Sequence, residues 1–296
     1  MKTFIRWQGN KSKYLKHLKK VIPNDIIQDI EDGNITYIEP FLGSGALFLD
    51  LQPERWIITD INKDNINIWK SIKENPYKII SEFKKFGKSF KIKTRENKIK
   101  FCKEKTKEID KLPYNFNRAS QFLLMKFCVY MGNIIVNNKF VFNGLDLNID
   151  NLNTYSFLKQ KYYDLLKQIS EYLNESNGKI YNKDYKLILS KAKKGDFVFL
   201  DPPYFEKHSY QFNYNKDETI DLKFLKDLKT ELINLDKKGI KWIMTYANTE
   251  EVKDVFKSFI IKKFKVFRRA SMKSTYELII LSNTLIDSAN IDIDEI

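Results

Sequence analysis

The chain has 296 residues, enough to bury a full hydrophobic core in one α/β domain or in a catalytic domain that carries an inserted lobe. Hydrophobic residues make up 43% and charged residues 30% of the sequence, which excludes wholesale disorder. The 52 Lys and Arg residues exceed the 38 Asp and Glu residues, giving a net charge of +14. This excess favours a polyanionic partner such as a nucleic acid, although lysines scattered over the surface for solubility would give the same balance.

Cysteine and histidine are scarce. Cys102 and Cys128 lack the spacing of metal ligands, and the chain has only 2 His, so we expect neither a disulfide nor a bound metal. Charged residues interrupt every apolar run near the N-terminus, and no segment approaches the length needed to cross a bilayer. We therefore expect a cytoplasmic protein without a signal peptide or a transmembrane segment.

The first part of the chain alternates between strands and helices. An apolar strand over residues 35–39 leads through a glycine-containing turn into a helical pattern over residues 46–51. A second strand, over residues 56–59, ends at Asp60 and is followed by a helix that reaches about residue 75. Alternating strands and helices of this kind predict a parallel sheet.

This alternation stops between residues 76 and 177. The segment is rich in lysine with interspersed aromatic residues, and a helical stretch over residues 118–131 can supply its core. We expect residues 76–177, here called the inserted lobe, to be a mostly helical target-recognition domain, with residues 1–75 and 178–296 forming the catalytic domain. The lysines of the lobe fit either a DNA-binding surface or an ordinary solvated face.

The alternation returns after the inserted lobe. Residues 196–200 form a very apolar strand, residues 221–235 a helix, and residues 241–246 another strand. The pattern predicts that a Rossmann-like α/β sheet, begun in the first part of the chain, continues here.

The end of the chain predicts one more helix and a hairpin. The helix begins near Asn248 and Thr249, with Glu251 placed to complete a capping box. Residues 259–267 and 276–281 suit two antiparallel strands at the edge of a mixed sheet.

A glycine motif follows the first strand. Residues 39–45 read Glu-Pro-Phe-Leu-Gly-Ser-Gly, and Gly43 and Gly45 would let the backbone and the next helix approach a ligand closely. Phe48 replaces the third glycine of the dinucleotide-binding pattern, which weakens a pyrophosphate-binding interpretation. Asp60, at the end of the second strand, lies where such sheets bind a ribose. The alternatives are a plain tight turn for the glycine loop and a helix cap for Asp60.

A second motif, Asp201-Pro202-Pro203-Tyr204, ends the apolar strand 196–200. An exocyclic amine of a nucleobase is a poor nucleophile, because its lone pair is delocalised into the ring. Asp201 can accept a hydrogen bond from one N–H group of this amine. The Pro202 carbonyl, which the rigid Pro202-Pro203 backbone directs, can accept a hydrogen bond from the other N–H group. Tyr204 offers a flat face for an extruded base. The alternative is a proline-rich turn with Asp201 as a cap, but the agreement of this motif with the glycine loop and Asp60 favours catalysis.

Together these motifs resemble the Dam-type, or D12 class, DNA adenine N6-methyltransferases, in which the glycine motif, a target-recognition insert and DPPY follow in the same order. Residues 6–11, Arg-Trp-Gln-Gly-Asn-Lys, are similar to the family's W-A-G-G-K segment, whose Trp and Lys touch the cofactor. The resemblance implies S-adenosyl-L-methionine as cofactor. The expected cofactor-binding residues are Trp7, Lys11, Glu39, Phe41, Gly43, Gly45, Asp60, Asp184, Tyr185 and Asp201.

The resemblance is weaker outside these motifs. Phe212 and Tyr214 resemble an F-x-x-Y element with one residue fewer, and Glu277 begins a segment similar to the family's closing E-L-L-I-x-N strand. In the inserted lobe only Asn133 and the Phe-Asn-Gly of residues 142–144 match the family, so the recognition sequence does not follow from the motif. The DNA-binding candidates are Arg118, Asn133, Asn137, Asn138 and Lys139.

These features predict an enzyme that transfers a methyl group from S-adenosylmethionine to N6 of adenine in double-stranded DNA at a specific short site, with a cognate restriction endonuclease as a possible partner. Cytosine C5 methylation would need a cysteine nucleophile beside the base, and neither cysteine follows a strand. Cytosine N4 enzymes usually have Ser in place of Asp201. An RNA adenine methyltransferase and a non-catalytic nucleic-acid-binding protein remain as alternatives.

Overall fold

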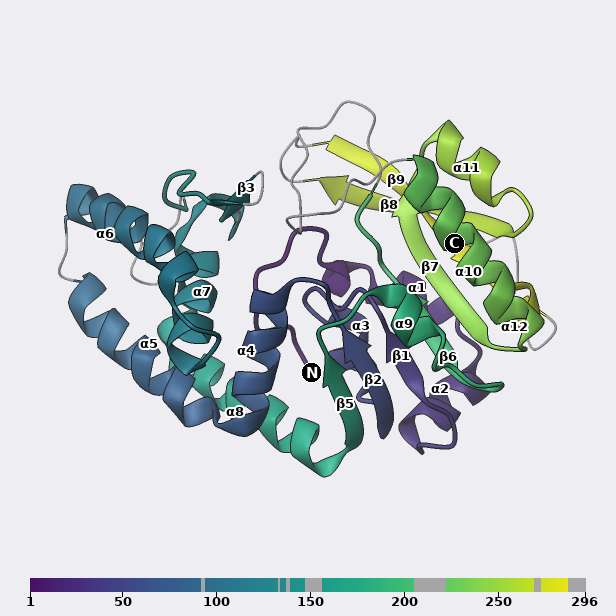
Figure 1. Ribbon diagram of the computed structural model, residues 1–296, viewed down its shortest axis with the longest axis horizontal. Coiled ribbons are helices and arrows are strands. Elements are labelled where there is room, and N and C mark those ends of the chain that lie inside the picture. The colour runs from purple at the N-terminus through teal and green to yellow at the C-terminus, as the bar shows by residue number, and fades with distance from the viewer. Residues whose placement is uncertain are drawn as a thin grey trace.

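The computed structural model describes residues 1–91, 94–132, 134–136, 139–146, 156–204, 222–268 and 273–286. Its centre is a seven-stranded sheet with the strand order β5-β2-β1-β6-β7-β9-β8 (Figure 1). The sheet is flanked by helices on both faces, and the helices of the inserted lobe lie beside it. The architecture confirms the predicted Rossmann-like α/β fold with an antiparallel edge.

Five strands run parallel and the last two form an antiparallel edge. Neighbouring pairs β5–β2, β2–β1, β1–β6 and β6–β7 are all parallel, whereas β9 is antiparallel to both β7 and β8. The strands are β1 (Tyr37–Glu39), β2 (Arg55–Thr59), β5 (Asn177–Tyr181), β6 (Phe197–Leu200), β7 (Lys241–Ala247), β8 (Ile260–Arg268) and β9 (Lys273–Leu281).

Successive strand residues point to opposite faces of the sheet, and each face has its own hydrophobic cluster. Tyr37 of β1 and Phe197 of β6 belong to the larger cluster, while Ile38 and Val198 belong to the smaller one. The larger cluster is covered by α1 (Leu15–Lys20), α2 (Asn24–Glu31), α3 (Ala46–Leu51) and α4 (Lys63–Glu74). The smaller is covered by α9 (Tyr185–Leu189), α10 (Leu222–Lys237) and α11 (Glu250–Phe256).

The carboxyl ends of the parallel strands meet at one edge of the sheet. Glu39 ends β1, Asp60 follows β2 and Asp201 follows β6. The reversed strand β9 adds a further carboxylate, because its Glu277 pairs with Ala247 at the end of β7. Acidic residues from four strands therefore gather where open α/β sheets bind their ligands.

The inserted lobe is mostly helical, as predicted. Its helices are α5 (Pro76–Lys91), α6 (Arg95–Glu108), α7 (Phe116–Cys128) and α8 (Gln160–Glu175), and a short antiparallel hairpin pairs β3 (Ile135–Val136) with β4 (Lys139–Phe140). In Figure 1, α5, α6 and α7 lie to the left of the sheet, with α4 between them and the strands. Short helical turns (Lys11–Lys13, Ile109–Lys111, Tyr130–Gly132 and Ser156–Leu158) and α12 (Asn283–Ile286) complete the described elements.

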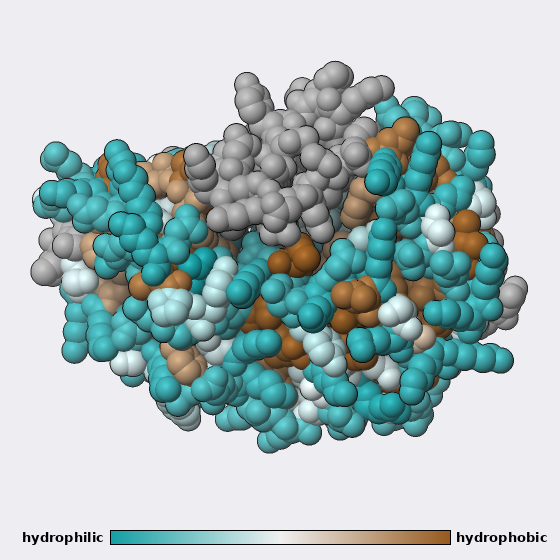
Figure 2. All heavy atoms as spheres, in the orientation of Figure 1, coloured by the Kyte–Doolittle hydropathy of each residue, from teal (hydrophilic) through white to brown (hydrophobic). Residues whose placement is uncertain are grey.

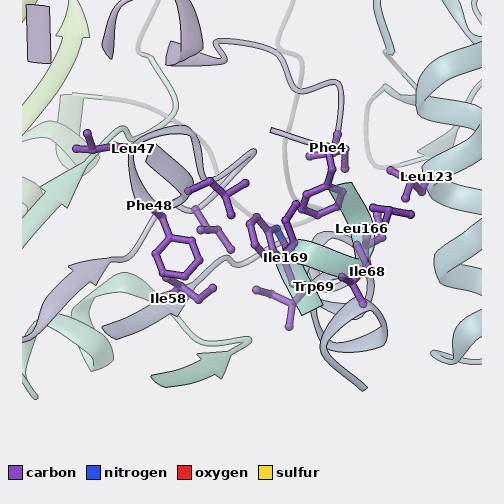
Figure 3. Close-up of a cluster of buried hydrophobic side chains, with 14 of the residues drawn as sticks. Phe4, Leu47, Phe48, Ile58, Ile68, Trp69, Leu123, Leu166 and Ile169 are labelled. Carbon is purple, nitrogen blue, oxygen red and sulfur yellow. The ribbon is translucent and has the colours of Figure 1, made fainter. Parts of the chain in front are cut away.

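The lobe and the sheet share one hydrophobic core. Figure 3 shows Phe4 and Trp69 beside Leu166 and Ile169 of α8, with Leu123 of α7 nearby. Phe4 meets Trp69 edge to face, with 4.8 Å between the ring centroids. All five side chains are essentially inaccessible to solvent. Because the core is continuous, the lobe is expected to move little relative to the sheet.

Several details of the elements differ from the sequence-based expectation. Strand β5 was not predicted, because at this sheet edge its residues are exposed or only half-buried and lack an apolar run. The cap of α11 is Thr249, whose hydroxyl accepts from the Val252 N–H. The predicted capping box was wrong, since Val252 occupies the third helical position and Glu251 the second.

One face of the molecule is mostly polar (Figure 2). Figure 2 shows a face that is mostly hydrophilic, with smaller hydrophobic patches near its middle. Within the described part of the chain, no helix combines the length and the apolar character that a membrane crossing requires.

Gly45 provides a test of the glycine loop. It precedes α3 with φ of +60°, and an added Cβ would lie 2.8 Å from the Trp69 ring. Gly195 has φ of +93° but nothing within 4 Å of an added Cβ. Gly195→Ala therefore measures the free-energy cost of the backbone conformation without a steric contact. We expect Gly195→Ala to lower the free energy of unfolding by roughly 1–2 kcal/mol and Gly45→Ala by roughly 1–3 kcal/mol more. Urea denaturation measures both, and equal losses would contradict the packing argument.

Candidate active site

Asp201 lies at the centre of the carboxyl-end cluster. Its Oδ1 accepts a hydrogen bond from Thr245 Oγ1 of β7 at 2.6 Å and lies 2.8 Å from the Lys11 ammonium. Among the described residues, no donor reaches its Oδ2, and none reaches the carbonyl of Pro202. One carboxylate oxygen is thus fixed by the protein, while the other and the next carbonyl are available to a ligand.

Lys11 is a buried cation that joins several carboxylates. Its side chain is 4% exposed, and its Nζ also lies 3.7 Å from Glu277 Oε2 and donates to the Gly9 carbonyl at 3.0 Å. Burying an ammonium is costly unless it is paired, and the contacts with Asp201 and Glu277 offset this cost.

Tyr204 packs into the same group. Its hydroxyl donates to Glu277 Oε2 at 3.0 Å, and its ring lies 5.0 Å from the Tyr246 ring and 4.9 Å from Lys11 Nζ. Burial raises the pKa of Tyr204 well above its usual value, and the negative charges of Asp201 and Glu277 raise it further. The phenol is therefore a neutral hydrogen-bond donor.

The glycine loop is closed by Trp7. A Cβ on Gly43 would lie 2.8 Å from the Trp7 ring, so the absence of a side chain allows this approach. Gly43 also has φ of +46°, in the left-handed region that glycine favours. The structure therefore brings the predicted Trp7, Lys11 and Gly43 together with Asp201.

Asp60 holds this loop in place. Its Oδ2 accepts from the Gly43 N–H at 2.8 Å and from the Asn65 side-chain amide at 3.0 Å, and its Oδ1 accepts from the Asn62 N–H. Burial raises the pKa of Asp60, although these hydrogen bonds oppose the rise. In the structure Asp60 makes loop contacts, and its expected ribose contact stays a prediction.

Glu39 is buried beneath the loop. Its Oε2 accepts from the Tyr37 hydroxyl at 2.7 Å. Burial raises the pKa of Glu39 well above its usual range, and the charges of Asp201 and Asp60 raise it further. A raised pKa favours the neutral form of Glu39, which lies beside the carboxyl groups of Asp60, Asp201 and Glu277 and near the buried lysines Lys11 and Lys126 of α7.

An aromatic pair lies on the other side of the loop. Phe41 and Tyr185 have ring centroids 5.2 Å apart, and both pack with the smaller hydrophobic cluster. Asp184 caps α9, since its side chain accepts from the Lys186 N–H at 2.8 Å. The half-buried Phe41 ring beside Tyr185 gives a flat, apolar wall suited to a nucleobase.

Arg118, a predicted DNA contact, is committed to the interior. Its Nε and Nη2 donate to the two carboxylate oxygens of Asp64 at 2.5 and 2.9 Å, and its Nη1 donates to the carbonyls of Ile109 and Leu112. The residue is 4% exposed, so it connects α7 to α4 instead of facing solvent. We therefore leave Arg118 out of the proposed DNA contacts.

The other DNA-binding candidates fall in or beside the β3–β4 hairpin. Asn133, Asn137 and Asn138 lie outside the described residues, as do Phe212 and Tyr214. The backbone of Lys139 begins β4. Their contact with DNA stays a prediction.

Sequence reasoning missed Thr245, Glu277 and Lys126 as site residues. Thr245 was a polar residue within an otherwise apolar strand, and Glu277 began the segment that resembles a family strand, so both carried a weak signal. Lys126 was one lysine among many in the inserted lobe. In the part of the chain that the structure describes, no group of three or more His, Cys, Asp or Glu side chains could hold a metal ion.

The mixed sheet and the Asp-Pro-Pro-Tyr edge define the class as a Rossmann-like methyltransferase. Residues 7–270 match the model of the D12 class N6 adenine-specific DNA methyltransferases, and the chain belongs to this family. It is therefore an adenine-specific DNA methyltransferase.

Curated relatives agree with this assignment. The chain is 27% identical to the Type II methyltransferase M1.LlaDCHI of Lactococcus lactis subsp. cremoris, covering 93% of this chain and 91% of the relative. It is 28% identical to the Type II methyltransferase M.MjaIII of Methanocaldococcus jannaschii, covering 95% and 99% respectively. It is 24% identical to the DNA adenine methylase of Haemophilus influenzae, covering 90% and 87%. The similarity thus extends over nearly the whole length of each protein.

The buried Arg118–Asp64 pair yields a stability prediction. Arg118→Met leaves the Asp64 carboxylate buried without its cation, and we expect the free energy of unfolding to fall by roughly 3–5 kcal/mol. Lys186→Met is the matched control, because Lys186 pairs with Asp227 at 2.8 Å on the exposed surface. That change should cost less than about 1 kcal/mol. Chemical denaturation of both variants tests the difference, and an Arg118→Met protein of unchanged stability that binds DNA weakly would return Arg118 to the DNA contacts.

Proposed function

We propose that this enzyme uses S-adenosyl-L-methionine to methylate N6 of adenine at a specific short site in double-stranded DNA, with Asp201, Pro202, Pro203 and Tyr204 as its catalytic segment. The observation that carries the proposal is the arrangement of Asp201, whose Oδ1 is held by Lys11 and Thr245. Its Oδ2 and the Pro202 carbonyl are the two acceptors that an amine with two N–H groups requires.

The protein's part in the reaction is orientation. Asp201 Oδ2 accepts one N–H of the adenine amine and the Pro202 carbonyl accepts the other, which turns the nitrogen lone pair toward the methyl group. Fixing the Oδ1 atom in advance means that little reorganisation is needed at the moment of transfer. Pro203 restricts the backbone, and its carbonyl is held by the Tyr246 hydroxyl at 3.0 Å.

The residues around the site fit a cationic methyl donor. When bound, S-adenosylmethionine would supply a methyl group from a positively charged sulfur. Its C–S bond would break to leave a neutral thioether, and the amine would lose one N–H proton, which Asp201 Oδ2 is placed to accept. The Asp201 carboxylate at the centre of the cluster favours the positive charge of the sulfur. Trp7 and Gly43 would bind the donor on one side of the loop, while Phe41 and Tyr185 would bind its adenine on the other.

Tyr204 would receive the target base. Its ring packs against the Tyr246 ring and lies near the Lys11 ammonium, and the hydrogen bond from its hydroxyl to Glu277 fixes its tilt. An adenine extruded from the duplex would stack on this ring, which keeps its amine beside Asp201.

The inserted lobe would bind the duplex. The β3–β4 hairpin, with Asn133, Asn137, Asn138 and Lys139, is our candidate for base contacts, and the net charge of +14 supports phosphate binding. Two relatives are named Type II methyltransferases, which supports a cognate restriction endonuclease as partner. We place the enzyme in the cytoplasm, where bacterial or viral DNA would be methylated.

The direct test is methyl transfer. The purified protein is incubated with labelled S-adenosylmethionine and unmodified duplex DNA of mixed sequence, and the product nucleosides are separated. Labelled N6-methyladenine is the expected product, and the labelled fragments reveal the site. Label in RNA alone would support the RNA alternative, and no label in either would support a non-catalytic binding protein.

Asp201→Asn tests the role of the central carboxylate. The amide keeps the size of the side chain but loses the charge, and we expect kcat to fall by roughly 10²–10³-fold while the cofactor Kd changes little. Asp196→Asn is the control, because Asp196 lies just before β6 and, among the described residues, its carboxylate accepts hydrogen bonds from the backbone N–H groups of Thr36 and Lys193. Its kcat should match that of the wild type. Equal loss of cofactor binding and turnover in Asp201→Asn would contradict the orienting role.

A further inference from the structure

Lys126 is a buried cation that none of the motifs explains. It lies on α7 of the inserted lobe, is 8% exposed, and donates one hydrogen bond, to the Gly132 carbonyl at 3.0 Å. Its Nζ lies 4.4 Å from the centroid of the Trp7 ring. No carboxylate of the described residues forms an ion pair with it, so two of its three N–H donors have no acceptor there.

The position of Lys126 connects the lobe to the glycine loop. Trp7, beneath its ammonium, is the ring that approaches Gly43. Asp60, which binds the Gly43 N–H, is near enough for its charge to act on Lys126. Burial lowers the pKa of Lys126 to about 8, and the Asp60 charge opposes this change. In most molecules the Lys126 side chain is therefore charged at neutral pH.

The two buried lysines of the site differ in their partners. The Lys11 ammonium is already paired with carboxylates, because its Nζ lies 2.8 Å from Asp201 Oδ1 and 3.7 Å from Glu277 Oε2. Among the described residues, the close contacts of the Lys126 ammonium are a carbonyl and aromatic rings. A buried ammonium with unused donors favours an anionic ligand.

The shape of the methyl donor identifies that anion. Its sulfur must lie near Asp201, and its adenine fits the Phe41–Tyr185 wall, which packs with the smaller hydrophobic cluster. Trp7 packs with the larger cluster, on the opposite side of the loop. The remaining arm of the donor is an amino acid, and its carboxylate is the donor's single anionic group.

We propose that Lys126 binds the carboxylate of the methyl donor's amino-acid end, so that the inserted lobe completes the cofactor site. This inference rests on the proposed use of S-adenosylmethionine. It makes cofactor binding depend on the seating of α7 against the glycine loop, and so links the lobe that meets DNA to the site of the chemistry.

The test compares two ligands by isothermal titration without DNA: S-adenosylmethionine, and its decarboxylated analogue, which keeps the sulfonium and the amine. The wild type should bind S-adenosylmethionine more tightly. Lys126→Met, which keeps the unbranched stem, should weaken S-adenosylmethionine binding roughly tenfold or more and leave the Kd of the analogue within about twofold. S-Adenosylhomocysteine, which keeps the carboxylate, should follow S-adenosylmethionine.

The controls separate this contact from folding and from the proposed function. Lys98→Met removes another buried lysine of the lobe, whose Nζ lies 5.6 Å from the Phe90 ring on the outer part of the lobe, and should change neither Kd. If Lys126→Met does not fold, the Kd values of the two ligands are compared for Lys126→Gln and for the wild type instead. Equal weakening for both ligands, or weaker DNA binding with normal S-adenosylmethionine binding, would overturn the proposal. A wild type that binds neither ligand would instead overturn the proposed function.

Discussion

The ion pair between Lys11 and Asp201 is the contact on which the site depends. It joins the N-terminal segment to the end of β6, and through Thr245 and Glu277 it also joins β7 and β9. Burial of the Lys11 ammonium is costly without a paired charge, and the carboxylates of Asp201 and Glu277 offset that cost. The same contact fixes one oxygen of Asp201 and thereby determines which oxygen faces a substrate. The proposed catalytic role of Asp201 therefore depends on the same pair of charges that holds these segments together.

The continuous core explains how a lobe between two halves of the sheet can take part in the active site. Trp69 of α4 packs against Phe4 and also comes close to Gly45. The helix that leads to the lobe therefore also supports the glycine loop. Arg118 fastens α7 to the same helix through Asp64. These contacts seat α7 so that Lys126 reaches Trp7.

The sequence was sufficient to predict the helices and strands that depend on the pattern of neighbouring residues. The helix over residues 46–51, the apolar strand at 196–200 and the antiparallel edge follow from periodicity and agree with α3, β6 and the β8–β9 pair. Motif spacing also placed Asp201 and Gly43 at one edge of the sheet. What could not be predicted was which charges would be buried together, because that depends on tertiary contacts. Arg118 and Lys126 lie eight positions apart on one helix, yet only the fold shows that one is paired with Asp64 and the other is not.

The reversed strand β9 has a consequence for how the enzyme comes into being. Glu277 reaches Lys11 and Tyr204 only when β9 has been inserted between β7 and β8, and β9 is the last strand of the sheet to leave the ribosome. Lys11, by contrast, emerges before every described strand of this sheet. A growing chain can form the glycine loop and the Asp-Pro-Pro-Tyr turn long before the carboxylate that completes their charge balance exists. Chains that do not yet extend past β9 would thus contain the recognisable motifs without a finished site.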